Sequence, residues 1–146
     1  MGFSHVGISV PPSKFDETLK FYLRALAPLG YKEILRPQEQ VVGLGVYGPT
    51  FWITAREDTA GEQHVHIAFD ASNYELIHKF YDAALKAGGR CNGKPGPRSY
   101  TKHYYGAFVL DPVGNNIEAL SLWPAWSHWK YWFGLGIFSR EASKQD

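Results

Sequence analysis

The sequence predicts an α+β fold in which two βαβββ modules follow one another and form a curved, mixed β-sheet that encloses a cleft. Three observations indicate it. Short alternating apolar segments, rich in branched and aromatic residues, are typical of strands. Each half of the chain also holds one amphipathic helical segment. Finally, the Phe21-Tyr22 pair precedes Phe80-Tyr81 by the same number of residues as Leu29-Gly30 precedes Gly88-Gly89, which indicates an internal repeat of about 60 residues.

The repeat sets the expected domain organisation. A single domain is predicted over residues 1–122, with module one at about 3–56 and module two at about 63–122. Residues 123–146 form a tail in which Trp123, Trp126, Trp129 and Trp132 recur at a constant spacing. That spacing gathers them on one side of a helix. Since large apolar patches are rarely exposed, we expect the tail to cover the domain or a partner subunit, and the protein to be a homodimer. An interfacial membrane anchor is the alternative.

Module one is predicted to begin with a strand, His5–Val10, which Pro11-Pro12 ends. A helix, Phe15–Leu29, carries apolar residues at helical spacing, with Ser13 as its expected N-cap and Gly30 just past its end. The remaining segments are the strands Tyr31–Leu35, Val41–Val46 and Thr50–Thr54, followed by a polar linker, Arg56–Glu62.

Module two repeats this order. The predicted segments are a strand, Gln63–Phe69, a helix capped by Ser72 or Asn73 that runs to about Ala87, a short strand, Arg90–Asn92, a loop, Gly93–Thr101, and two final strands, Tyr104–Leu110 and Asn116–Leu122. Between the last two strands, Asp111–Asn115 has the composition of a tight turn, because proline fixes φ while glycine and asparagine tolerate positive φ.

The composition narrows the function. Of the 146 residues, 45% are hydrophobic and 20% are charged, which suits one globular domain with a core. A net charge of +1 without long basic runs argues against nucleic-acid binding. No apolar run reaches the roughly 18 residues of a membrane span, the N-terminus lacks the pattern of a signal peptide, and the single cysteine, Cys91, cannot form an internal disulfide. We therefore expect a cytoplasmic protein.

Three residues on separate strands predict a metal site. Glu118 is the one acid in the apolar final strand, and a carboxylate there is costly unless it has a partner. His5 and His66 lie on the first strands of the two modules, and they come into register if the first turn is two residues longer than its counterpart. His64 shares a strand face with His66 and is the less favoured alternative.

Two imidazoles and one carboxylate suit a single divalent transition metal ion, such as Zn, Fe, Ni or Mn. Three protein ligands leave coordination positions open, as in catalytic rather than structural sites. The internal symmetry places Trp52 opposite Glu118, where a fourth ligand would otherwise stand.

The segments HVGISV, HIAFDA and YYGAFVLDPVGNNIEAL resemble those of the vicinal oxygen chelate superfamily, which includes glyoxalase I, extradiol dioxygenases, and fosfomycin- and bleomycin-resistance proteins. The resemblance covers roughly residues 3–122. It implies paired βαβββ modules and a metal ion held by His5, His66 and Glu118. Trp52 departs from the glyoxalase I pattern, which has Glu or Gln there, so the ligand set is closer to that of the extradiol dioxygenases.

The predicted function is a divalent-metal-dependent enzyme that acts on a small substrate chelating the metal through adjacent oxygens, as an isomerase, a lyase or a ring-cleaving dioxygenase. The candidates for the acid/base group that such an enzyme adds are His103, Tyr104, Tyr105 and Tyr100, of which His103 or Tyr105 is predicted to transfer the proton. The candidates for contacts with the substrate are Trp52, Arg98, Tyr100 and His64. The alternative is a metal-free protein that sequesters a small molecule, of the bleomycin-resistance kind.

Overall fold

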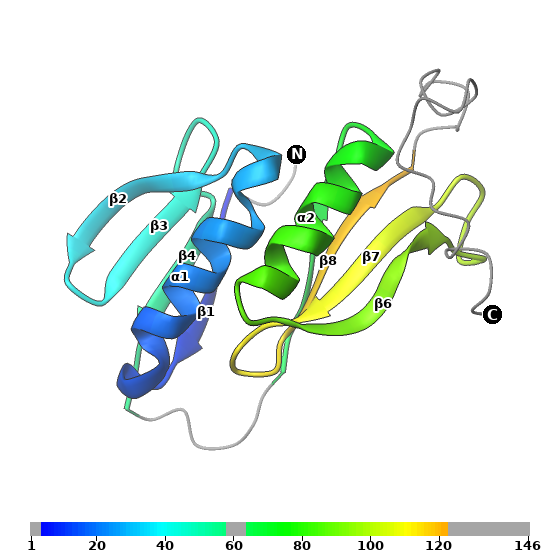
Figure 1. Ribbon diagram of the computed structural model, residues 1–146. Coiled ribbons are helices and arrows are strands. Elements are labelled where there is room, and N and C mark those ends of the chain that lie inside the picture. Colours follow the sequence, from blue (N-terminus) through cyan, green and yellow to red (C-terminus); the bar gives the residue numbers. More distant parts are fainter. Residues whose placement is uncertain (1–3, 58–63, 123–146) are drawn as a thin grey trace.

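The computed structural model describes residues 4–57 and 64–122. The tryptophan-rich tail and most of the predicted linker lie outside the described residues. Within them, the strand–helix–three-strand order occurs twice and gives two four-stranded sheets (Figure 1). The predicted fold class is confirmed, with one mixed sheet for each module.

Module one contains strand β1 (Val6–Val10), helix α1 (Phe15–Ala25), and strands β2 (Lys32–Gln38), β3 (Val41–Gly45) and β4 (Phe51–Ala55). The strand order is β1-β4-β3-β2, and the β1–β4 pair is parallel. Gly30 ends the helical segment with a φ of 85°, in the left-handed region that favours glycine.

Module two contains strand β5 (His66–Asp70), helix α2 (Tyr74–Lys86), and strands β6 (Arg90–Pro97), β7 (Tyr105–Leu110) and β8 (Asn116–Ser121). Its strand order, β5-β8-β7-β6, repeats that of module one. Asn73 caps α2 as predicted, because its side-chain oxygen accepts a hydrogen bond from the backbone N–H of Leu76 at 3.0 Å.

Two local predictions are wrong. Ser13 does not cap α1; it lies inside a 3₁₀ turn, Pro12–Lys14, and the residue before α1 is Lys14, which makes no side-chain cap. The predicted loop Gly93–Thr101 is strand as far as Pro97. Glycine and proline are tolerated there because β6 is an edge strand with irregular pairing to β7.

The register of the two sheets confirms the internal symmetry residue by residue. In module one, Trp52 pairs with Gly7 on the parallel neighbour. In module two, Glu118 pairs in the same way with Ala68. Trp52 and Glu118 are therefore equivalent, and so are His5 and His66, each two residues before the paired position.

A buried hydrogen-bond cluster connects the two modules. The hydroxyl of Tyr22, on α1, donates to Oδ2 of Asp111 at 2.6 Å, in the turn between β7 and β8. The Asp111 carboxylate also accepts from the backbone N–H groups of Val113 and Asn115 and from the Asn115 side chain. Tyr22 and Asp111 are 0% and 2% exposed, so water cannot replace these bonds.

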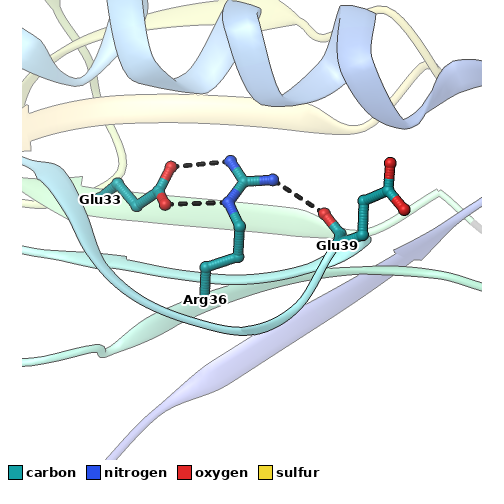
Figure 2. Close-up of polar contacts among 3 residues, drawn as sticks. All are labelled: Glu33, Arg36 and Glu39. Carbon is teal, nitrogen blue, oxygen red and sulfur yellow. Dashed lines mark hydrogen bonds and ion pairs between the residues drawn. The ribbon is translucent and has the colours of Figure 1, made fainter.

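The edge strand of the first sheet, β2, carries a pair of opposite charges. On β2, Arg36 donates two hydrogen bonds to the Glu33 carboxylate, at 2.8 and 2.9 Å, and one to the backbone oxygen of Glu39 at 2.8 Å (Figure 2). The hydrogen bonds from Arg36 to its carboxylate lower the pKa of Glu33. Charged groups on an edge strand discourage pairing with further strands.

Candidate functional site

The face of the second sheet that is turned away from the core carries the candidate site. Side chains alternate along β7 and β8: Ala107, Val109 and Ile117 belong to the core cluster, whereas Glu118 and the directly paired Phe108 lie between them in sequence and outside that cluster. Because successive residues of a strand point to opposite faces, Glu118 and Phe108 share the open face.

Glu118 and His66 meet on this face. Nε2 of His66, on β5, lies 2.9 Å from Oε2 of Glu118, on β8. The Glu118 side chain is 1% exposed, whereas that of His66 is 53% exposed. The carboxylate therefore lies at the bottom of the site and the imidazole at its rim.

Tyr104 contacts the other oxygen of the same carboxylate. Its hydroxyl donates a short hydrogen bond to Oε1 of Glu118. Burial, followed by the hydrogen bond and the negative charge of Glu118, raises the pKa of Tyr104, so the hydroxyl stays a donor at neutral pH. A Cβ atom at Gly106 would lie 2.9 Å from that same oxygen and 3.3 Å from the Tyr104 ring. Glycine at this position therefore leaves the room that the Tyr104–Glu118 contact occupies.

The segment between β6 and β7 brings a cation and a second aromatic ring to the site. The backbone N–H of Arg98 donates to the Tyr104 carbonyl at 2.9 Å, which closes the loop. The Arg98 guanidinium lies over the Phe108 ring, 5.4 Å from its centroid. Tyr100 is exposed and packs edge-on against Tyr104, with ring centroids 5.2 Å apart.

The equivalent face of the first sheet carries an aromatic surface. The Trp52 indole covers Gly43: a Cβ atom on that glycine would lie 3.0 Å from two ring atoms. Its Nε1–H donates to the Pro49 carbonyl at 3.1 Å. A planar apolar surface thus stands where the second module has a carboxylate.

His5 lies away from the His66–Glu118 pair, next to a pocket at the junction of the modules. Its imidazole is exposed, and Nδ1 lies 2.7 Å from the Ser4 hydroxyl. The pocket has a volume of about 280 Å³ and is lined by residues of β1, β4 and β5 and by Tyr31. In residues 4–57 and 64–122, no three His, Cys, Asp or Glu side chains are grouped to hold one ion. A single chain thus brings His66 and Glu118 together, and does not bring His5 to them.

The His66–Glu118 pair nevertheless fits part of a metal site. Imidazole nitrogen and carboxylate oxygen are the donors that divalent transition metals accept. Nε2 and Oε2 lie 2.9 Å apart, at hydrogen-bond distance, so the two donor atoms point to the same place, as two ligands of one ion must. The chemistry and spacing of this pair fit two of the three predicted ligands.

Three other sequence candidates lie away from Glu118. His64 packs at the β7–β8 turn, where a Cβ atom on Gly114 would lie 2.6 Å from its ring. His103 is exposed, and its φ of 68° is the single left-handed value among the described non-glycine residues. Tyr105 is buried on the core face of the second sheet, stacked on Tyr74 with ring centroids 4.0 Å apart. Its neighbour Tyr104 contacts Glu118 instead, because one residue along a strand changes the face.

Two βαβββ modules, with a His–Glu pair on the open face of the second sheet and an aromatic surface on the equivalent face of the first, define a class of paired-module α+β proteins. The family model of the Glyoxalase/Bleomycin resistance protein/Dioxygenase superfamily matches residues 2–119. The chain therefore belongs to this superfamily.

Solved structures show the same architecture. A glyoxalase/bleomycin resistance protein from Albidiferax ferrireducens T118 is 29% identical with a TM-score of 0.67, over 82% of this chain and 97% of that one. A glyoxalase/bleomycin resistance protein/dioxygenase family enzyme from Burkholderia phytofirmans PsJN is 21% identical with a TM-score of 0.67, over 84% and 100%. TioX from Micromonospora sp. ML1 is 12% identical with a TM-score of 0.61, over 82% and 99%.

No curated protein matches the chain. Neither helix of the described segments has the length and apolar character needed to cross a membrane.

Proposed function

We propose that the protein is a divalent-metal-dependent enzyme that acts on a small substrate with two adjacent oxygens, as an isomerase, a lyase or a ring-cleaving dioxygenase. The observation that supports it most is the Glu118–His66 pair. A carboxylate that is 1% exposed has lost most of its hydration, which costs free energy unless charge or hydrogen bonds compensate. A cation held between Oε2 and the imidazole would supply that compensation.

The third ligand, His5, is proposed to come from a second copy of the chain. Within one chain, His5 lines the pocket beside residues 67–70 of β5 and does not join the His66–Glu118 pair. If all three residues hold one ion, two chains must face each other through their open sheet faces. This arrangement would also bring the Trp52 surface of one chain opposite the carboxylate of the other.

The roles proposed for the chain's own residues follow from their contacts. Tyr104 holds Oε1 of Glu118 and leaves Oε2 directed toward His66. Trp52 and Tyr100 offer aromatic surfaces that can pack against a substrate and exclude water. When bound, a divalent ion at such a site supplies Lewis-acid stabilisation of an oxyanion on the chelating oxygens. Tyr104, protonated at neutral pH, is the hydroxyl placed to move a proton next to Glu118.

Metal analysis tests the proposal. Protein purified without a metal-affinity tag, or reloaded separately with Zn, Fe(II), Ni or Mn, is expected to hold about one ion per chain, and the variants His66→Ala and Glu118→Gln are expected to lose it. Removing even an outer-sphere partner of a metal site typically costs 10–100-fold in affinity, so a ligand substitution should cost more. The proposal is refuted if both variants keep the affinity of the wild-type protein. Oxygen uptake on catechols by the Fe(II) form would indicate a dioxygenase.

A mixing experiment tests the origin of the third ligand. His5→Ala and Glu118→Gln homodimers should each bind no ion. If the ligands come from two chains, refolding the two variants together gives mixed dimers with one intact site, and about one quarter of all sites should recover metal. No recovery, in dimers shown to be mixed by mass spectrometry, would mean that His5 is not a ligand across the interface.

The second candidate function is metal-free binding of a planar small molecule. It is favoured by the hydrogen bonds of Glu118, since both carboxylate oxygens have protein partners without any cation. The Trp52 surface would then be the main contact. In this case a planar aromatic ligand should quench the tryptophan fluorescence equally well in the presence of EDTA and in Glu118→Gln, and Trp52→Phe, which leaves the other four tryptophans, should reduce the quenching.

A further inference from the structure

Arg98 is held in place by the chain rather than by a counter-ion. Its Nη2 donates to the Lys94 carbonyl at 2.6 Å and its Nη1 donates to the Pro97 carbonyl at 3.0 Å. The guanidinium also rests on the Phe108 ring. These contacts fix a side chain that would otherwise be highly mobile, so little conformational entropy remains to be lost when a ligand binds.

The neighbouring strand is shaped to admit this guanidinium. Gly93, on β6, pairs directly with Phe108 on β7. A Cβ atom at Gly93 would lie 2.9 Å from the Phe108 ring and 3.3 Å from Nη2 of Arg98. The space above Phe108 is therefore available to the guanidinium because residue 93 has no side chain.

The positive charge of Arg98 has no carboxylate partner among residues 4–57 and 64–122. The nearby carboxylate, Glu118, is instead bonded to His66 and Tyr104. A guanidinium has five N–H donors in a planar fork, and two of its nitrogens serve the carbonyls named above. Donors remain for a bidentate bond to a planar oxyanion.

Phe108 links this cation to the candidate metal ligands. Its ring centroid lies 5.4 Å from Cζ of Arg98 and 6.1 Å from the centroid of the His66 ring. The guanidinium and the imidazole are thus separated by no more than the sum of these two distances. That span is within the reach of one small organic molecule.

We propose that Arg98 binds an anionic group of the substrate, so that the substrate class is a small organic acid whose carboxylate meets Arg98 while its adjacent oxygens lie at His66 and Glu118. This inference rests on the proposed function for the position of the two oxygens, whereas the Arg98 site itself does not depend on a metal. If Arg98 has this role, the protein binds carboxylated substrates more tightly than neutral molecules of the same shape.

The test uses two probes that differ in one group, 3,4-dihydroxybenzoate and 4-methylcatechol. Their affinities are measured by calorimetry for the wild-type protein, Arg98→Gln, and Lys102→Gln, which removes an exposed cation in the same loop. Each protein is titrated both zinc-loaded and metal-free. Wild-type protein is expected to prefer the carboxylated probe by about 10- to 100-fold, the usual strength of a charge-assisted hydrogen bond. Arg98→Gln should lose this preference and Lys102→Gln should keep it.

The outcomes separate this inference from the metal proposal. If zinc strengthens both probes but the wild-type protein shows no preference, or Arg98→Gln keeps it, the inference is overturned and the metal site survives. If zinc has no effect but the preference depends on Arg98, the anion site stands and the metal proposal fails. Should Arg98→Gln not fold, the Nε–H resonance of Arg98 in the wild-type protein decides: it should shift with the carboxylated probe and not with 4-methylcatechol, and equal shifts would overturn the inference.

Discussion

Replacing Tyr22 with Phe tests the buried link between the two modules. The substitution keeps the ring, which packs at the core, and removes only the hydroxyl that donates to Asp111 at 2.6 Å. The carboxylate keeps its three other hydrogen bonds, from Val113 and Asn115. Because the site is buried, water cannot take the place of the lost donor.

The expected loss follows from the charge of the acceptor. A hydrogen bond to a charged group contributes about 1.5–3 kcal/mol, and burial favours the upper half of that range, so we expect the free energy of unfolding to fall by about 2–3 kcal/mol. For a chain of this size the loss corresponds to a decrease in Tm of roughly 3 °C per kcal/mol. This is a large share of the 5–15 kcal/mol that is typical of a domain.

Urea unfolding, followed by tryptophan fluorescence and by circular dichroism, measures this loss. Tyr47→Phe is the matched control, because Tyr47 is 100% exposed and should leave the midpoint unchanged. A double-mutant cycle with Asp111→Ala isolates the pairwise energy. The reasoning is refuted if Tyr22→Phe costs less than about 0.5 kcal/mol, the range of an ordinary surface substitution.

Three further substitutions test the surroundings of Glu118 and the half-buried histidine of α2, His78. Gly106→Ala should displace Glu118 or Tyr104 and lower stability by about 1–3 kcal/mol, as measured by thermal unfolding, whereas Gly48→Ala, with no atom near its added Cβ, should not. Tyr104 ionises near pH 10 in the unfolded chain but stays neutral at that pH in the folded protein, so the free energy of unfolding should decrease as pH rises above about 10. The free energy of unfolding of Tyr104→Phe should decrease less steeply, and identical slopes for the two proteins would exclude this origin. Burial lowers the pKa of His78 in the folded protein. As pH falls below about 6.5, the histidine is therefore protonated more readily in the unfolded chain, and the free energy of unfolding should decrease. Urea titrations of His78→Gln should show a smaller decrease, and an unchanged pH profile would contradict this explanation.

The repeated order of strands and helices could be predicted because it is written in local patterns. The Phe-Tyr pairs, the glycines after each helix and the turn at Asp111 set the lengths of the segments. These lengths place Trp52 opposite Glu118 and make His5 equivalent to His66, as the strand register confirms. Because each residue advances a strand by a constant rise, two modules with equal segment lengths place their corresponding residues at the same positions.

The local patterns did not predict features that depend on which face of a strand a residue occupies, or on pairing with a distant strand. Gly93–Pro97 has the composition of a loop, yet pairing with β7 makes it an edge strand, and the cap expected at Ser13 is replaced by a 3₁₀ turn. Tyr104 and Tyr105 are indistinguishable by composition, and only the alternation of β7 directs one to Glu118 and the other to the core.

The sequence by itself determined the fold, the internal repeat and the candidate ligands His5, His66 and Glu118. The tertiary structure decided which of them meet, bringing His66 to Glu118 and leaving His5 at the junction of the modules. It also decided the partners of the carboxylate and the fixed position of Arg98 over Phe108. The physical reason is that local patterns specify each strand, whereas contacts between side chains far apart in the chain depend on how the sheets pack.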